Sequence, residues 1–194
     1  MSAALSPFDG AGARERARRQ THARIYAAAL AAFARVGFDA ASVTEIARVA
    51  GVSRPTFYAH FPTREHVLAE LQWHKEMEVC HRIAACRTLR ETLAVLPDAL
   101  VDALLGIPGA TTAQDMIRLH ARETPEASPS PFPLVELLQE RFRQGELEGD
   151  LAPGLGAAQA AQLCLKSIFG YLMVTPTEID RAGDLRTLVG LFLA

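Results

Sequence analysis

The sequence is poor in the residues that mark secreted or membrane-spanning proteins. Its three cysteines, Cys80, Cys86 and Cys164, are an odd number without the paired spacing of a disulfide framework or a zinc ribbon. Its longest apolar run covers only residues 25–34, about half of the roughly 20 residues that a bilayer requires. The first twelve residues lack the pattern of a signal peptide. We therefore expect a cytoplasmic protein without membrane contact and with reduced core thiols, a redox-sensing cysteine being the alternative.

Motifs typical of common enzymes are also missing. The sequence has no P-loop, no glycine-rich dinucleotide fingerprint, no GxSxG and no HExxH, and its carboxylates are scattered along expected helix surfaces. We therefore expect no enzymatic activity, no catalytic residues and no cofactor. A helical enzyme with dispersed catalytic groups is the alternative from another functional class.

What is present is an ordinary globular composition with an uneven distribution of charge. The 194 residues are 49% hydrophobic and 22% charged, which is typical of a folded chain. The net charge of −2 divides into +4 for residues 1–66, from nine arginines and five acidic residues, and −6 for residues 67–194. A basic first third favours an N-terminal end that binds a polyanion such as nucleic acid.

Helical periodicity extends along the chain without competing strand-like alternation, so the predicted fold class is all-α. The pattern predicts helices over residues 14–36, 42–50, 53–61, 63–86, 88–105, 112–122, 134–144, 157–174 and 179–194, with a Pro-rich break at 124–133 and a loop at 145–156. We expect a flexible N-terminus over residues 1–13, a DNA-binding domain over residues 14–63 and a second helical domain over residues 64–194.

Local signals define the ends of the first helices. Gly37 is expected in a left-handed conformation, with a hydrophobic contact from Phe38 behind it. Ser42 and Glu45 have the spacing of a capping box. Ser53 can cap the short third helix, whose first turn tolerates Pro55 because the missing amide would be unpaired there.

A helix, a glycine-containing turn and a short helix, here residues 42–61, follow in the order of a helix-turn-helix. The second helix of this motif enters the major groove and presents its N-terminal residues to base edges. The side chains expected to be exposed on it are Arg54, Pro55, Thr56, Tyr58 and Ala59, with Phe57 and Phe61 turned inward. Arg54 can form a bidentate pair with a guanine, whereas the hydroxyls of Thr44 and Tyr58 suit phosphate oxygens.

The runs 37–47 and 50–65 closely resemble the DNA-binding domain of the tetracycline-repressor-like (TetR) family, and the resemblance covers about residues 16–70. It implies an N-terminal helix-turn-helix domain joined by a long helix to a helical bundle that binds a ligand and dimerises. Arg64 stands where the family usually has lysine, which keeps the charge but changes its geometry. The DNA-binding residues that follow are Thr44, Ser53, Arg54, Pro55, Thr56, Tyr58, His60 and Arg64.

Roles for these residues also follow from the resemblance. Arg54, Pro55 and Thr56 would face bases. The phosphate contacts would come from Thr44, Tyr58, His60 and Arg64. His60 could instead be a core residue that closes the short helix.

The resemblance further implies a homodimer built by the last two helices. Helix 157–174 is apolar nearly all round, so it needs burial on two sides. The candidate interface residues are Ala161, Leu165, Ile168, Leu172, Leu188 and Phe192. Two copies would bring two recognition helices to a partly palindromic operator with half-sites about 34–36 Å apart or somewhat more.

A small-molecule effector is expected between helices of the C-terminal domain. The candidate lining residues are Trp73, Met77, Cys80, Met116, His120, Phe132 and Phe142, and each of them could instead be a core residue. Few charges among them favour a neutral or aromatic ligand. His74, Glu78 and His81 share one side of the long helix and could bind a transition metal, but a hydrated polar face is the favoured interpretation, and no metal is expected.

Together these features predict a ligand-responsive, dimeric and nucleoid-associated transcriptional regulator. A repressor that binds palindromic operator DNA and is released by a small molecule is the favoured form, because the family that the chain resembles consists mostly of repressors, and occupying an operator suffices to exclude a polymerase. A DNA-binding protein that organises the chromosome or recruits partners without an effector is the alternative.

Overall fold

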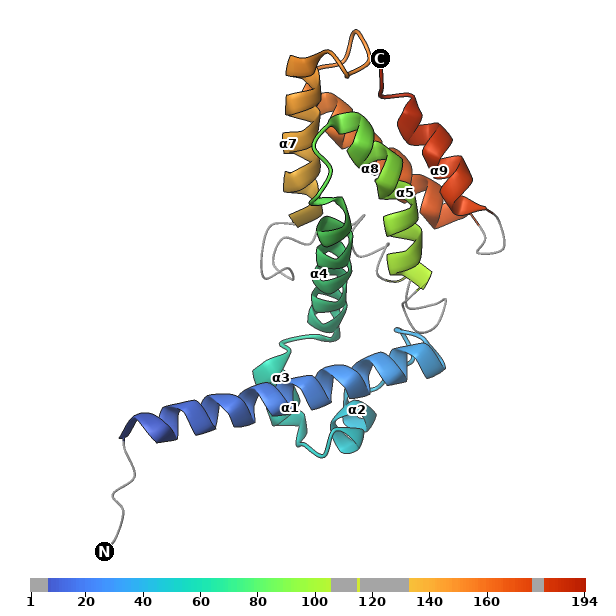
Figure 1. Cartoon of the computed structure of the whole chain (residues 1–194). Coiled ribbons are helices and arrows are strands. Elements are labelled where there is room, and N and C mark those ends of the chain that lie inside the picture. The colour runs from blue at the N-terminus through green and yellow to red at the C-terminus, as the bar shows by residue number, and fades with distance from the viewer. Residues whose placement is uncertain (1–6, 106–114, 116–132, 176–179) are drawn as a thin grey trace, which may run out of the picture. The chain divides into compact units, whose positions relative to one another are not determined.

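The protein is all-helical over the part of the chain that the structure describes. The computed structural model describes residues 7–105, 115, 133–175 and 180–194. Apart from one isolated β-bridge, the secondary structure of these residues consists of helices (Figure 1). The chain forms two compact units, Met1–Val67 and Leu68–Ala194, and their boundary falls inside helix α4, Arg64–Ile83. Among the described helices none has the length and apolar character to cross a membrane.

The N-terminal unit contains helices α1 (Pro7–Val36), α2 (Val43–Val49) and α3 (Arg54–His60), followed by the first residues of α4. Helix α1 packs on α2, and α2 packs on α3. Ile25, Ala29 and Phe33 form the fully buried stripe of α1, whereas Val36 is exposed at the end of the helix. Helix α1 begins at Pro7 rather than at residue 14.

Two predicted local signals of this unit are confirmed. Gly37 has a φ of +80° and ends α1, and the ring of Phe38 lies 5.1 Å from that of Phe33. The Ser53 hydroxyl accepts a 3.2 Å hydrogen bond from the Thr56 amide at the start of α3, where Pro55 lies in the first turn. The entry into α3 is therefore fixed by its own sequence.

The predicted capping box at the start of α2 is wrong. Ser42 occupies the N-cap, but its side chain makes no capping hydrogen bond. The Glu45 carboxylate instead accepts two hydrogen bonds from Arg48, at 2.7 and 2.8 Å. A bidentate pair with a guanidinium one turn ahead competes successfully with a bond back to a single amide.

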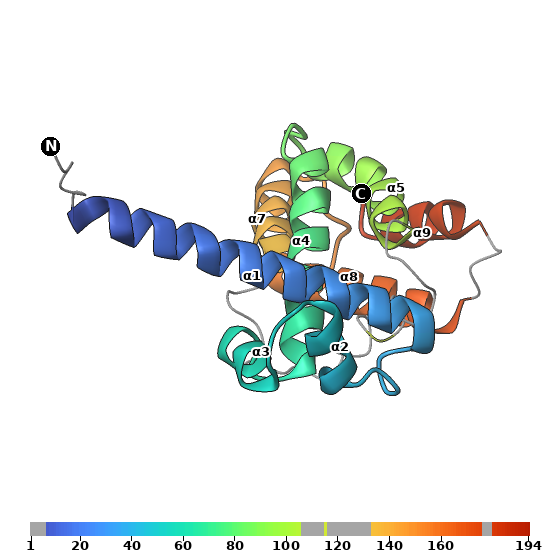
Figure 2. The same ribbon diagram turned by 90° about the horizontal axis from the view of Figure 1, so that it is seen from below.

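The C-terminal unit contains the rest of α4 with helices α5 (Leu89–Leu105), α7 (Pro133–Glu148), α8 (Ala157–Val174) and α9 (Arg181–Gly190). Helix α7 packs along α8 and α5 packs along α9, while α5 also contacts α7 and α8 contacts α9 (Figures 1 and 2). Their shared core is mainly aliphatic and contains the rings of Phe142 and Phe192, which meet edge-on with 6.0 Å between centroids. The predicted helix at 112–122 and the break at 124–133 lie outside the described residues, except for positions 115 and 133.

Two predicted boundaries in this unit are wrong. The loop expected from residue 145 begins later, because Gly145 lies buried within α7 against α5, where a Cβ would come within 2.6 Å of Leu89 Cδ2. The glycine therefore allows close packing instead of ending the helix. The last helix ends at Gly190, and the chain then turns back so that Leu193 pairs with Leu151 and the Ala194 amide bonds to the Asp150 carbonyl at 2.9 Å.

Candidate nucleic-acid interface and C-terminal pocket

Helix α3 is held from one side and exposed on the other. Phe57 is 0% exposed and Phe61 is 2% exposed. Arg54, Pro55 and Ala59 are exposed on the outer side, as is Tyr58, whose ring meets that of Phe57 edge-on. This is the pattern of burial that the sequence predicts, with Phe57 and Phe61 inside and Arg54 and Tyr58 at the surface.

The hydroxyl residues near α3 differ in their surroundings. Thr44 is exposed on α2, and Ser53 is exposed at the cap of α3. Thr56 is half-buried, and its hydroxyl lies 2.8 Å from that of Ser53. Thr44 therefore has a surface position suited to a phosphate contact, whereas Ser53 and Thr56 are partly engaged with each other.

Arg64 has a structural role that sequence reasoning missed. Its Nη1 donates hydrogen bonds to the backbone carbonyls of Phe38, Asp39 and Ala41, at 2.8, 3.2 and 2.7 Å. Its guanidinium also lies over the Phe38 ring, 4.8 Å from the centroid. The side chain therefore ties the α1–α2 connection to the start of α4. A phosphate contact by Arg64 stays a prediction.

His60 belongs to an aromatic cluster between α1 and α3. His22 stacks on Phe61 at 4.4 Å between ring centroids and lies 5.7 Å from His60. Burial lowers the pKa of His60, and the nearby His22 and Arg18 lower it further. The neutral imidazole is therefore favoured, which supports the core interpretation of His60 over a charged phosphate contact.

A helix, a tight turn at Gly51 with a φ of +66°, and a second helix with one exposed face define a helix-turn-helix DNA-binding protein. The family model described as bacterial regulatory proteins, tetR family, matches residues 25–71. These residues therefore form a DNA-binding domain of the TetR type, as found in transcriptional regulators. Members of this family are regulators of transcription rather than enzymes.

Similar proteins extend this likeness beyond the matched segment. An uncharacterised helix-turn-helix transcriptional regulator of Mycobacterium tuberculosis is 28% identical over 139 residues, covering 71% of this chain and 72% of the relative. The solved structure of Thermus thermophilus FadR, a TetR-family repressor in complex with lauroyl-CoA, has a TM-score of 0.65 and 25% identity, covering 88% of this chain and 92% of that one. A ketosteroid transcriptional regulator of M. tuberculosis shares the fold, with a TM-score of 0.58, 17% identity and coverage of 89% and 95%.

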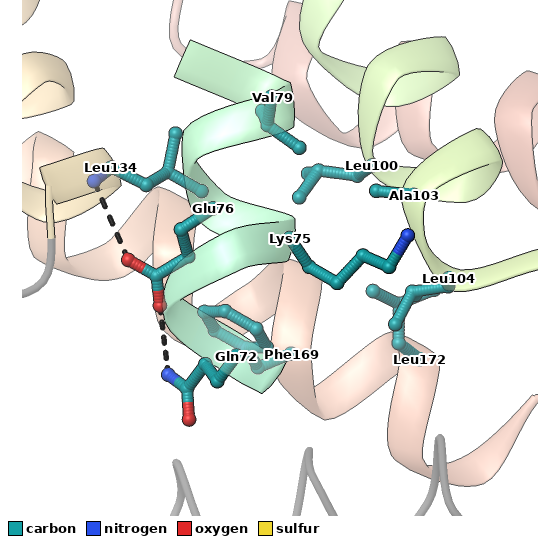
Figure 3. Close-up of a pocket in the computed structure, with 10 residues that line it drawn as sticks. All are labelled: Gln72, Lys75, Glu76, Val79, Leu100, Ala103, Leu104, Leu134, Phe169 and Leu172. Atoms are coloured by element: carbon teal, nitrogen blue, oxygen red, sulfur yellow. Dashed lines mark hydrogen bonds between the residues drawn. The ribbon is translucent and has the colours of Figure 1, made fainter. Parts of the chain in front are cut away.

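The C-terminal unit holds a small pocket between α4, α5, α7 and α8 (Figure 3). Its volume is about 40 Å³, which is room for water rather than for a larger molecule. The wall is mainly apolar, and its polar side chains all come from α4. The residues that line it are Gln72, Lys75, Glu76, Val79, Leu100, Ala103, Leu104, Leu134, Phe169 and Leu172.

The residues predicted to bind a ligand do not line this pocket where the structure describes them. Trp73, Met77 and Cys80 are half-buried on α4, and Phe142 is fully buried in the core. Met116, His120 and Phe132 lie outside the described residues. The face of α4 that lines this pocket includes two buried polar residues, Gln72 and Glu76, and ligand binding by Trp73, Met77 and Cys80 stays a prediction.

Glu76 is the buried acid of the pocket wall, with 6% exposure. Its carboxylate accepts hydrogen bonds from Gln72 Nε2 at 2.7 Å and from the Leu134 amide at 3.4 Å (Figure 3). Burial raises the pKa of Glu76, and these two hydrogen bonds oppose the rise. Lys75 extends along the wall toward Leu104 in Figure 3, and its Nζ forms an ion pair with Glu78 at 2.9 Å.

The candidate metal ligands and the cysteines form no site among the described residues. His74, Glu78 and His81 are exposed, Glu78 pairs with Lys75, and the described residues contain no group of three or more metal-ligating side chains. Burial raises the pKa of the Cys164 thiol to about 12 and, with help from Glu76, that of Cys80 to about 11. A thiol with a raised pKa forms little of the reactive thiolate, which favours the core interpretation of both cysteines.

The predicted interface stripe lies inside the protomer's own core. Its members Ala161, Leu165, Ile168, Leu172 and Phe192 are buried without a partner chain, and Leu188 is half-buried. Exposed apolar side chains lie elsewhere on the same helix, with Leu163 41% and Val174 80% exposed. The stripe is therefore accounted for by the protomer's own packing, and the place of a dimer interface stays a prediction.

The two serines before α2 and α3 provide a matched test of capping. We expect Ser53→Ala to lower the free energy of unfolding by about 1 kcal/mol, because the Thr56 amide loses its acceptor. Ser42→Ala is the control and should change stability little, because its hydroxyl caps nothing. Urea unfolding followed by circular dichroism measures both, and equal losses would contradict the assignment.

The buried carboxyl of Glu76 makes stability depend on pH. The pKa of Glu76 is raised in the folded state. Its contribution to the free energy of unfolding is therefore complete below the ordinary carboxyl pKa and is lost as the pH rises through the raised pKa. Glu76→Gln, which mimics the protonated form, should therefore be more stable than the wild type near neutral pH. The difference should vanish at about pH 4.

Urea unfolding of both proteins across this pH range measures the effect. Glu136→Gln, a change at an exposed position of α7, is the control and should bring no gain at neutral pH. A Glu76→Gln protein less stable than the wild type near neutral pH would show that the two accepted hydrogen bonds outweigh the burial.

Proposed function

We propose that the protein is a homodimeric transcriptional repressor that binds a palindromic operator and is released by a small molecule. The observation that carries this proposal is the orientation of α3. Phe57 and Phe61 anchor its inner side, and Arg54, Pro55 and Tyr58 are presented outward. A rigid helix with an arginine at its exposed N-terminal end is suited to reading the major groove.

Different roles at the DNA are proposed for these side chains. Arg54 reads a guanine, with Pro55 and Thr56 beside it against the bases. Tyr58 and Thr44 donate to phosphate oxygens from exposed positions. Ser53 acts mainly as the cap of α3, and Arg64 adds positive charge while it holds the α1–α2 connection in place.

A homodimer is proposed through the outer face of α8. The exposed Leu163 and Val174 on this face would be covered by the same face of a second copy, as in an isologous interface. Two recognition helices related by a twofold axis then require half-sites about 34–36 Å apart or somewhat more.

The effector is proposed to enter the pocket beside Glu76. Its wall supports a neutral molecule with an apolar body and a hydrogen-bond donor, because apolar side chains surround a buried carboxylate and the Gln72 amide. The cavity of about 40 Å³ must widen to hold such a molecule, so binding favours a different conformation of the pocket. The complex of FadR with lauroyl-CoA supports a ligand with a long apolar part.

Base reading and phosphate contact can be separated on one selected DNA. A duplex is first selected by the wild-type protein from a randomised pool, and affinities for it and for a scrambled duplex are measured by fluorescence anisotropy. We expect Arg54→Ala to lose about 1–3 kcal/mol of discrimination at one base pair of each half-site. Tyr58→Phe, the matched phosphate variant, should weaken binding to both duplexes alike.

Two outcomes would count against these assignments. Equal losses by Arg54→Ala on the selected and scrambled duplexes would show that Arg54 contacts the backbone. A wild-type protein that enriches no sequence from the pool would refute operator recognition and would favour a chromosome-organising role.

The effector proposal is tested with a matched pair of ligands, decanol and decanoate. Decanol should lower the affinity of the wild-type protein for its duplex, because its hydroxyl can donate to Glu76. Decanoate should have little effect, because a second carboxylate beside Glu76 is unfavourable. Ala103→Phe, which fills the pocket from α5, should bind DNA normally but lose the response to decanol. Release by decanoate alone would refute the proposed ligand class.

A further inference from the structure

The N-terminal half of α1 carries basic side chains beyond the core of its unit. All residues from 12 to 20 are exposed, whereas full burial on α1 begins at Ile25. In Figure 2 this half of α1 continues past α3. The helix is therefore longer than its packing requires, and its extension needs another explanation.

One stripe of α1 connects this extension to the end of the recognition helix. Arg14, Arg18 and His22 are spaced four residues apart, so they lie above one another on one face. His22 stacks on Phe61 directly after α3, and the charge of Arg18 acts on His60 at the last turn of α3. The face that packs against this end of α3 therefore continues along the extension as a row of guanidinium groups.

The chemistry of the extension fits a polyanion. Residues 12–20 contain four arginines and one acidic residue, and Glu15 is already paired with Arg19 at 3.0 Å. Their apolar side chains are alanines alone, so the segment lacks the large apolar face that a helix lying on a membrane needs. At 1.5 Å per residue, the helix from Pro7 to residue 20 is about 21 Å long, which matches about six base pairs of duplex.

We propose that Arg14 and Arg18 form a second DNA contact of each protomer, on phosphates of the duplex that flanks the half-site read by α3. This inference rests on the proposed function and adds to it a contact without base specificity. Phosphate contacts of this kind raise affinity in a salt-dependent way and fix the orientation of the protein on the duplex. The contact also requires DNA beyond the sequence that α3 reads.

The test combines two duplex lengths with two sets of variants. The duplex selected by the wild-type protein is prepared with flanks of about ten base pairs and with flanks of about two base pairs. The shorter flanks end before the extension of α1 could contact them fully. Arg14→Ala/Arg18→Ala removes the proposed contact. Arg16→Ala removes an exposed charge of the same extension about 200° around the helix from Arg14, and it is the matched control.

The wild type should bind the long duplex about tenfold more tightly than the short one at about 0.1 M salt. The double variant should bind both duplexes as the wild type binds the short one. Its slope of log affinity against log salt on the long duplex should fall by about two per half-site, because about one counterion is released per phosphate contact. Arg16→Ala should behave as the wild type. Arg14→Ala alone should lose part of the length effect, which guards against a disturbance of His60 by the change at Arg18.

Other outcomes would overturn the inference. Double-variant affinities equal to the wild type on both duplexes, or reduced by the same factor on both, would refute a flank contact while leaving operator recognition intact. The wild type could bind phosphatidylglycerol vesicles that the double variant does not bind, with DNA affinities unchanged. That result would assign the extension to a membrane surface instead. Failure of the wild type to bind any duplex would refute the proposed function and this inference together.

Discussion

The burial of Phe57 and Phe61 is the constraint on which the DNA-binding unit depends. Helix α3 has only seven residues, far fewer than the roughly 12–15 that an isolated helix needs to be even marginally stable in water. The Ser53 cap starts the helix, but the two phenylalanines hold it against its neighbours and set its rotation. Arg54 and Tyr58 lie at the surface because the buried phenylalanines fix the rotation of the helix that carries them.

Much of this arrangement could be predicted because its determinants are local in sequence. The positive φ of Gly37 and the Ser53 cap each depend on residues within about a turn of one another. The capping box failed for an equally local reason, since Arg48 offers the Glu45 carboxylate two donors in place of one. The Ser42–Glu45 spacing predicted correctly where α2 begins, but it did not predict that Glu45 would pair with Arg48.

The features that the sequence could not predict are long-range. The carbonyls that Arg64 binds lie 23 to 26 positions earlier, and no periodicity relates them to it. The face of α4 that lines the pocket could not be predicted from hydrophobic spacing, because Gln72 and Glu76 on this face are polar and yet buried. Similarly, an apolar helix such as α8 reveals that it is buried on two sides without revealing which side its own chain covers.

The position of the buried acid suggests how a pocket ligand can act on the DNA-binding unit. Helix α4 contributes Arg64 to the N-terminal unit and, three turns later, Glu76 to the pocket wall of the C-terminal unit. Under the proposed function, α4 would connect effector binding to an equilibrium between two states of the protein. A ligand shifts such an equilibrium only by its difference in affinity for the two states. Under the proposed function, a ligand donor that satisfies the buried carboxyl of Glu76 would supply part of the free energy for release, because burial raises the pKa of this group and disfavours its unpaired charge.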